Sequence, residues 1–370
     1  MALMSSLPPT LTRTQTQRPA AGTRHGVHRG HGGSRRGSLQ SFQSSSSSSP
    51  STSQGTSAYE PRSTYAVSSY QTLVRDACQA IVTALNDNYT RIDVDFPALN
   101  NSDGYTGGSD NYIDNNAQYA LATARLLEDA RGLKTHVVLP DLTEMARAEK
   151  MLKSALELTS GASLGCLEKG YWLNTAMLSL SGGGKMDRLV EEEEAAAKRA
   201  DVFIITNVTA VELPAVRKYV EEVCGDRPVI LYNTELDTLR ADLGLGPFFP
   251  PKSMHYEFLT QFLTVFYIRP RDYSKSTSVA PFLVNYSGAI FREYPGPWQA
   301  MIKQDNGELA CVAERPERYA LQELKEALLE VMGLNTEEAG STMAFLRRGY
   351  KRMTWWEEGS DEEASGVWRT

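Results

Sequence analysis

The chain has 370 residues, of which 41% are hydrophobic and 22% are charged, and its formal net charge is −7. This composition is typical of a folded globular protein, and no apolar run approaches the roughly 20 residues that a transmembrane helix needs. Residues 1–59 hold six arginines and no acid, so the rest of the chain carries −13, which excludes general electrostatic binding of nucleic acid. The four cysteines form no C-x-x-C pair, which argues against a zinc site or a disulfide framework.

The N-terminal segment, residues 1–59, is rich in Ser, Arg and Thr and includes an unbroken serine run from Ser44 to Ser49. Such a segment buries too little apolar surface to offset the entropy lost on ordering. An Arg- and Ser-rich, acid-free N-terminus is the composition of an organelle transit peptide. We therefore predict a chloroplast transit peptide with a disordered Ser-rich linker; the alternative is a plain disordered tail.

The folded part begins with a helical pattern from Ser68, followed by a strand at Arg91–Pro97 in which apolar residues alternate with Asp93 and Asp95. Helical and strand patterns then alternate along the chain. The further predicted strands are 135–139, 162–167, 201–206 and 228–232. Five strands separated by helices predict a doubly wound, mostly parallel sheet with helices on both faces.

The pattern changes after residue 244. The segment 254–268 is compatible with helix or strand, and strands are predicted at 287–294 and 298–302. Asn306-Gly307 is a strong hairpin signal, with a return strand at 309–312 and a last helix at 319–332. We interpret this region as an antiparallel C-terminal extension of the same sheet. The predicted α/β domain spans 65–335, and a polar tail spans 336–370.

Four polar residues follow predicted strands, at the edge where parallel sheets bind ligands: Asp95, Asp141, Asn207 and Asn233. A cluster of carboxylates and amides at that edge could hold a metal, a ribose or a peptide. The competing interpretation is that Asp141 caps a helix and the asparagines close turns. Lys185 ends a glycine-rich loop that could cradle a phosphate, although it does not match the P-loop pattern and an acidic run follows. No residue set predicts a catalytic group, a metal or a cofactor.

Two aromatic segments are candidate contact surfaces for a partner or a membrane. The first is the rigid turn that contains Tyr294, Pro295 and Trp298; exposed aromatics there would anchor a partner, and buried ones would pack on the core. The second interleaves cations with aromatic residues and suits an anionic membrane, unless its tryptophans pack back on the domain. Its contact residues are Arg347, Arg348, Lys351, Arg352, Trp355 and Trp356.

Four short motifs occur in a fixed order behind the transit-like leader. They are VDFP at 94–97, N-x-x-L at Asn233 to Leu236, F-L-x-x-F at 258–262 and R-x-YPGPW at Arg292 to Trp298. The set resembles a plastid and cyanobacterial family of unknown function that includes the "low photosystem II accumulation" assembly factors. The resemblance spans roughly residues 68–333, and one departure is Thr234, where family members often carry proline.

The resemblance implies a stromal, partly thylakoid-associated protein. Its partners would be photosystem II subunits or assembly and insertion factors, and it would act through protein contacts without chemistry of its own. The family also includes copies fused to a plastid adenylate kinase, which leaves more than one role open for its domain. The alternative is a nucleotide- or sugar-phosphate-binding enzyme on the doubly wound sheet.

Overall fold

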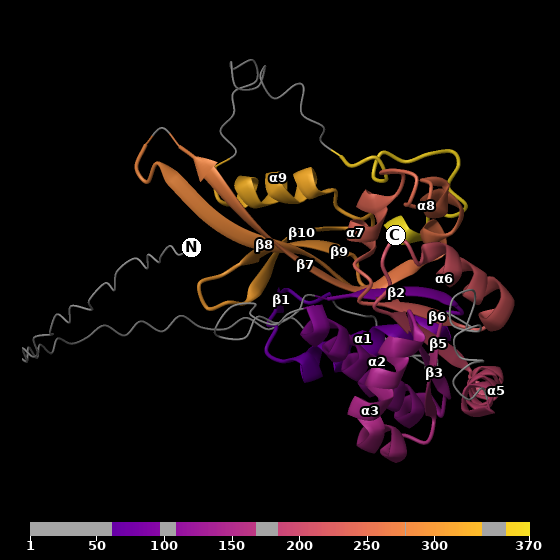
Figure 1. Cartoon of the computed structure of the whole chain (residues 1–370). Coiled ribbons are helices and arrows are strands. Elements are labelled where there is room, and N and C mark those ends of the chain that lie inside the picture. The colour runs from indigo at the N-terminus through magenta and orange to yellow at the C-terminus, as the bar shows by residue number, and fades with distance from the viewer. Residues whose placement is uncertain (1–60, 97–108, 168–183, 278, 335–352) are drawn as a thin grey trace, which may run out of the picture. The chain divides into compact units, whose positions relative to one another are not determined.

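The computed structural model describes residues 61–96, 109–167, 184–277, 279–334 and 353–370. Its central feature is one sheet of ten strands in the order β1-β10-β9-β8-β7-β2-β6-β5-β3-β4 (Figure 1). The strands are β1 (Thr64–Tyr65), β2 (Arg91–Asp95), β3 (Thr135–Leu139), β4 (Ala162–Cys166), β5 (Val202–Thr206), β6 (Val229–Tyr232), β7 (Leu263–Ser276), β8 (Leu283–Glu293), β9 (Trp298–Lys303) and β10 (Leu309–Arg315).

The sheet has a parallel half and an antiparallel half that meet at β7. Strands β4, β3, β5, β6, β2 and β7 run parallel to one another. Strand β7 pairs in parallel with β2 on one side and antiparallel with β8 on the other, and β8, β9, β10 and β1 continue antiparallel. The predicted fold class, a doubly wound, mostly parallel sheet with an antiparallel C-terminal extension, is confirmed.

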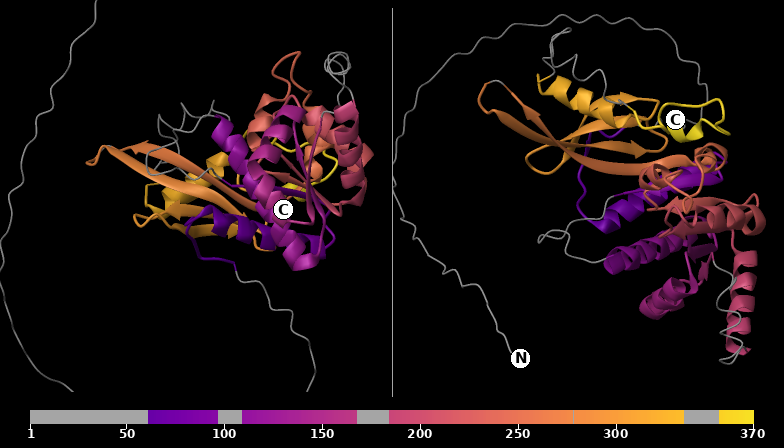
Figure 2. Two further views of the ribbon diagram at one scale, coloured as in Figure 1. Left: turned by 60° about the horizontal axis from the view of Figure 1, so that its bottom comes forward. Right: turned by 45° about the horizontal axis from the view of Figure 1, so that its top comes forward.

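Helices cover both faces of the sheet (Figures 1 and 2). Helices α1, α2 and α3 lie on one face; α5 to α9 lie on the other. The helices are α1 (Tyr70–Asn86), α2 (Ser109–Arg131), α3 (Leu142–Leu158), α5 (Gly184–Arg199), α6 (Leu213–Tyr219), η1 (Val220–Cys224), α7 (Leu236–Asp242), α8 (Ser253–Glu257), η2 (Leu259–Gln261), α9 (Leu321–Val331) and η3 (Val367–Arg369). Within the described residues, no helix is long and apolar enough to span a bilayer.

Local sequence signals explain where several elements begin and end. The Ser69 hydroxyl accepts the backbone N–H of Thr72 and caps α1, as expected for an N-cap serine. Gly307 has a φ of +87° in the turn between β9 and β10, which a glycine adopts without steric cost. The segment 254–268, compatible with either state, is divided between them: α8 and η2 come first, and β7 follows.

Strand β2 is buried on both faces. Ile92, Val94 and Phe96 pack into the core beneath α1 and α2. Asp93 and Asp95, which alternate with them, are only 3% and 7% exposed, because the opposite face is covered as well. The alternation in the sequence therefore marks an apolar and a buried polar face, not an apolar and a solvated one.

The C-terminal segment 353–370 packs on the domain, although the predicted domain ended at 335. Trp368 is 1% exposed and lies against His255 of α8, with ring centroids 5.2 Å apart. Two backbone hydrogen bonds hold the segment: Arg318 N–H donates to Arg369 O, and Ala364 N–H donates to Tyr256 O. The described end of the chain is thus an integral part of the fold.

Candidate functional site

Two of the predicted site residues, Asn207 and Asn233, are joined through a third asparagine at the carboxyl edge of the sheet. Asn116 of α2 donates to Asn207 Oδ1 at 3.0 Å, and its own Oδ1 accepts from Asn233 Nδ2 at 3.1 Å. Asn233 Oδ1 also accepts the N–H of Phe96, so the ends of β2, β5 and β6 are connected. Asn207 and Asn233 both have positive φ, as the turn interpretation expected. The three asparagine side chains therefore use much of their hydrogen-bonding capacity within the protein.

Asp141 lies at the end of β3 and caps α3. Its Oδ1 accepts the N–H of Glu144 at 2.8 Å, which matches the helix-cap interpretation. Burial raises the pKa of Glu144 to about 7, and the neighbouring Asp141 adds to the rise, while a hydrogen bond from Asn207 opposes it. Lys185 lies in the first turn of α5, and its side chain is outside the described residues.

Asp95, the fourth predicted residue, is buried beside a second carboxyl group. Burial raises the pKa of Asp95 well above its usual range, and nearby Asp93 raises it further. Burial also raises the pKa of Asp93 to about 6, although Arg240 and a hydrogen bond from Thr264 at 3.0 Å lower it. Three cavities lined by described residues lie elsewhere, and neither Asp95 nor Asn207 lines any of these three.

A buried ionic cluster, which the sequence did not predict, lies next to these two aspartates. Asp237 of α7 is at its centre and pairs with three arginines: Arg318 at 2.6 Å, Arg240 at 3.0 Å and Arg269 at 3.3 Å. Tyr267 of β7 donates its hydroxyl to the same carboxylate at 2.9 Å. Burial alone would raise the pKa of Asp237, but Arg318, Arg240 and Arg269 together hold it far below its usual range. We call this group the Asp237 cluster.

The C-terminal segment covers the Asp237 cluster with Trp368. The guanidinium carbons of Arg240 and Arg318 lie 4.6 and 5.7 Å from the centre of the Trp368 indole, within the range of cation–π contacts. His255 is fully buried between Trp368 and Trp355, and burial lowers the pKa of His255 to about 3, with Arg240 adding to the effect. The cluster therefore joins α7, α8, β7 and the C-terminal segment into one unit.

The predicted contact aromatics are mostly buried. Trp298 is 0% exposed and lies beneath Arg292 and Arg318, so its indole is not accessible to a partner. Tyr294 is half-buried and donates to Asp87 Oδ2 at 2.8 Å, whereas Pro295 is exposed. Trp298 and Tyr294 therefore pack on the domain, as the core interpretation of this turn expected.

In the second aromatic segment, Trp355 packs beside α8, and Trp356 is 8% exposed. Arg347, Arg348, Lys351 and Arg352 lie outside the described residues.

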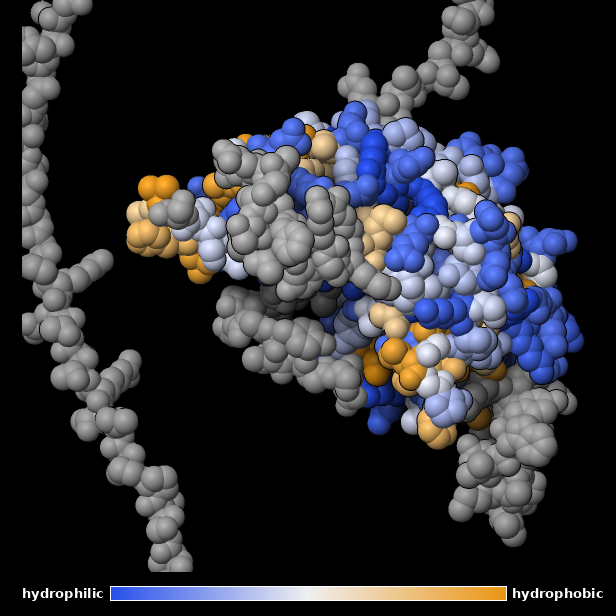
Figure 3. All heavy atoms as spheres, turned by 90° about the horizontal axis from the view of Figure 1, so that it is seen from above, coloured by the Kyte–Doolittle hydropathy of each residue, from blue (hydrophilic) through white to orange (hydrophobic). Residues whose placement is uncertain are grey.

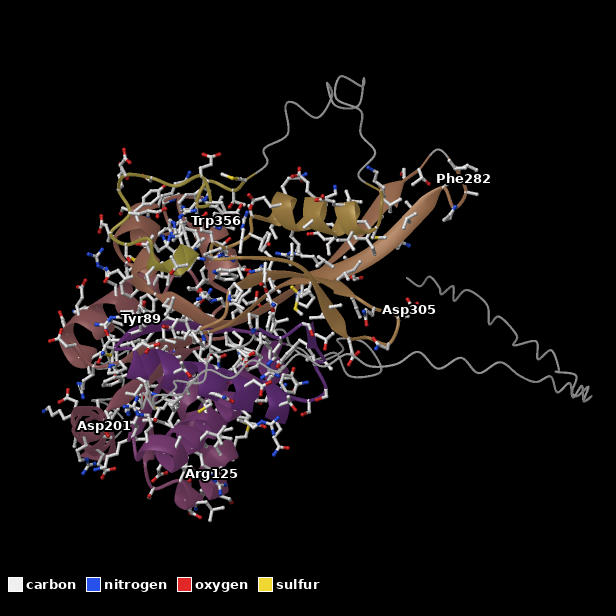
Figure 4. The ribbon with its side chains drawn as sticks, turned by 180° about the vertical axis from the view of Figure 1, so that it is seen from behind. Tyr89, Arg125, Asp201, Phe282, Asp305 and Trp356 are labelled. Atoms are coloured by element: carbon white, nitrogen blue, oxygen red, sulfur yellow. The ribbon has the colours of Figure 1, made fainter. Side chains whose placement is uncertain are left out.

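An exposed apolar surface occurs instead at the end of the long hairpin formed by β7 and β8. Val279, Phe282 and Leu283 are 73%, 69% and 54% exposed. Figure 4 shows Phe282 at the far end of this hairpin, and in Figure 3 the hairpin end is orange beside a largely blue surface. We call these three residues the hairpin tip. A second exposed group, Phe248 with Leu245, lies in the loop between α7 and α8.

The described residues at the predicted edge do not assemble a catalytic constellation. Within the described part of the chain, no three His, Cys, Asp or Glu side chains are grouped to hold a metal ion. The only sequence signal for the Asp237 cluster is the spacing of Asp237 and Arg240, which places both on one face of a short helix. Nothing local indicates that Arg269 and Arg318 join them.

Comparison with known families gave one match. A family described as Domain of unknown function (DUF1995) matches residues 68–326. The chain belongs to this family. The match begins just before α1 and ends within α9, so it includes every parallel strand and the antiparallel strands β8 to β10. Searches of curated proteins and of solved structures gave no significant match.

Proposed function

We propose that this protein is a non-catalytic chloroplast protein that assists photosystem II assembly or accumulation through protein–protein contacts at the thylakoid surface. The ordered motifs and the composition of residues 1–59 support the stromal side of the membrane and the kinship with "low photosystem II accumulation" factors. The partners would be photosystem II subunits or their assembly and insertion factors.

The observation that carries the proposal is the hairpin tip. Three large apolar side chains that are more than half exposed, at the end of a paired two-stranded hairpin, favour a contact surface over a stability role. From Tyr273 to Arg292 the hairpin contains no acidic residue, whereas the chain after residue 59 carries −13. An apolar tip without acids suits a partner next to anionic lipid, because it avoids repulsion from the membrane surface.

The test is affinity purification from solubilised thylakoids and from stroma, followed by mass spectrometry. The wild-type chain is compared with Phe282→Ser and with the matched control Phe248→Ser, since Phe248 is 86% exposed on a different loop. We expect photosystem II core or insertion subunits with wild type and the control, and their loss with Phe282→Ser. Purification of the wild-type chain without any such subunit would refute the function. Equal recovery with Phe282→Ser would refute only the role of the hairpin tip.

A second candidate function is a nucleotide- or sugar-phosphate-binding enzyme that uses the carboxyl edge of the sheet. It is supported by two carboxyl groups at that edge, Glu144 and Asp95, whose pKa values are raised by burial, a property common at functional sites. A thermal-shift screen against nucleotides and sugar phosphates tests it. A flat screen would remove this candidate and leave the binding function as the single proposal.

A further inference from the structure

A groove of about 590 Å³ lies between the start of α8, the outer part of β7, helix α9 and the C-terminal segment. Its walls bring together cations and aromatic rings from four separate parts of the chain. The cations are Lys252, Arg271 and Lys325, and the rings are Tyr273, Trp355 and Trp356. Figure 4 labels Trp356 beside α9 and the C-terminal segment. None of the predicted ligand residues lines this groove.

The groove is cationic although the domain is acidic. Three positive side chains face one carboxylate, Glu357, so the formal charge of the lining is +2. That carboxylate is already engaged, because Glu357 Oε2 accepts both the N–H and the hydroxyl of Thr354 at 2.8 Å. No ion pair is found for Lys252, Arg271 or Lys325 among the described residues.

Three polar atoms of the groove's lining residues lack hydrogen-bond partners. They are Arg271 Nε, Tyr273 Oη and Trp356 Nε1, each buried from solvent. A buried donor without an acceptor costs on the order of 1–3 kcal/mol. Small side-chain rotations, which commonly accompany binding, would direct these donors to an acceptor in the groove. With the two lysines, the lining residues carry five donor groups.

The aromatic wall is arranged to hold a flat or apolar body next to that charge. Lys252 Nζ lies 4.6 Å from the centre of the Trp355 ring, so the cation and the indole are adjacent. Tyr273 is stacked on Tyr286 with ring centroids 5.3 Å apart, which fixes its orientation. The apolar side chains of Leu321 and Met353 also line the groove.

We infer that this groove binds an organic phosphate, with its phosphate among Lys252, Arg271 and Lys325 and its apolar or aromatic body against Tyr273, Trp355 and Trp356. A phosphate ester carries about −1.5 to −2 charges and three acceptor oxygens, which matches the +2 lining and its five donors better than a carboxylate does. The inference does not depend on the photosystem proposal. The ligand could be a free organic phosphate or the headgroup of a lipid.

The first test is isothermal titration of the full chain with three probes. The probes are 1-naphthyl phosphate, inorganic phosphate and uncharged 1-naphthol. We expect 1-naphthyl phosphate to bind at least tenfold more tightly than either of the others, because only it supplies both the charge and the apolar body. Failure of 1-naphthyl phosphate to bind would overturn the inference. Equal affinity for inorganic phosphate or for 1-naphthol would overturn the role of the aromatic wall or of the cations.

The variants are Lys325→Gln and Arg271→Gln, with Lys303→Gln as the control because Lys303 is exposed at the end of β9, outside the groove. Each groove variant should weaken 1-naphthyl phosphate binding at least tenfold, and the control should stay within twofold. Unchanged affinity in both groove variants would place the ligand elsewhere. That outcome would overturn this inference without refuting the second candidate function, so the two can fail separately.

The source of the phosphate is resolved with phosphatidylcholine vesicles prepared with and without phosphatidic acid. Sedimentation with phosphatidic acid vesicles that is lost in Lys325→Gln and competed by 1-naphthyl phosphate supports a lipid headgroup. No sedimentation, together with binding of 1-naphthyl phosphate, supports a free organic phosphate. Sedimentation that neither the variant nor the competitor reduces would assign the membrane contact to another surface and overturn the lipid assignment.

Discussion

Asp237 and Arg318 are 81 positions apart in the sequence, and their side chains form a 2.6 Å ion pair that is almost completely shielded from water. Two further arginines and a tyrosine converge on the same carboxylate. A buried charge is tolerated only when it is paired. These contacts therefore fix the positions of α7, β7 and the chain before α9 relative to one another.

The first prediction concerns the carboxylate at the centre of the Asp237 cluster. Asp237→Asn keeps the volume but leaves three buried guanidinium groups without their counter-charge. We expect a loss of about 3–5 kcal/mol in the free energy of unfolding, measured by urea denaturation at pH 7. Asp361→Asn is the matched control, because Asp361 is exposed in the same C-terminal segment. Equal free energies of unfolding for the two variants would show that the ion pairs of Asp237 do not contribute to stability.

The second prediction concerns the C-terminal segment. Trp368→Ala removes a buried indole that covers two arginines and His255. We expect a loss of about 3–5 kcal/mol and faster proteolysis of residues 353–370. Phe248→Ala, at an 86% exposed aromatic, should change the stability little. An unaltered proteolysis rate in Trp368→Ala would mean that the segment is held by its backbone contacts alone.

The third prediction concerns the pH dependence that Asp93 contributes. An acid whose folded-state pKa is raised to about 6 binds its proton more tightly in the native state, so the native state gains stability as pH falls from above 6 toward 4. Asp93→Asn removes the cost of burying the charged carboxylate, which wild type carries at high pH. The variant should exceed wild type by about 1–3 kcal/mol at pH 8, and the difference should shrink toward pH 4.5. A difference that does not vary with pH would contradict the shift.

The fourth prediction concerns His255, whose pKa shift has the opposite consequence. Burial lowers the pKa of His255 to about 3. Below pH 6.5, His255 is therefore protonated in the unfolded chain but stays neutral in the native state. Stability from this group is therefore lost as pH falls from 6.5 toward 3, by up to about 1.4 kcal/mol per pH unit. His255→Phe should make the fall between pH 6.5 and 4.5 shallower. Identical slopes would show that His255 titrates normally.

The fifth prediction concerns the close packing of β8 against β9 and α9. A Cβ on Gly288 would lie 2.4 Å from the backbone oxygen of Met301 and 2.6 Å from a methyl carbon of Leu328. Gly288→Ala should therefore cost about 1–3 kcal/mol through overpacking, as measured by thermal unfolding. Gly246→Ala meets no atom within 4 Å and serves as the control. An unchanged unfolding temperature in Gly288→Ala would contradict this prediction, because it would mean that strand β9 can shift away from the added methyl group at no cost in stability.

Local patterns carry much of the fold but little of the site. Periodicity predicts β3 at 135–139 and the hairpin at Asn306-Gly307, because both depend on near neighbours in the sequence. The position of β2 between β6 and β7 is not predictable, because strand order depends on long-range pairing. The Asp237 cluster is not predictable from the sequence for the same reason, because Asp237, Arg269 and Arg318 are far apart in the chain. Tryptophan is a residue type common at binding surfaces, so the sequence alone does not show that Trp298 is buried; that depends on its neighbours in the folded structure.

The position of β2 has a consequence for how the chain reaches its native state. This strand is made first among the parallel strands, yet it lies between β6 and β7, and its Asp93 meets Thr264 of β7 across 171 positions of sequence. Until those later strands exist, both edges of β2 have no permanent partner. Contacts this distant slow folding and prolong the exposure of strand edges. We therefore expect refolding from urea to be slow, and a chaperone that holds the unfinished chain to raise its yield.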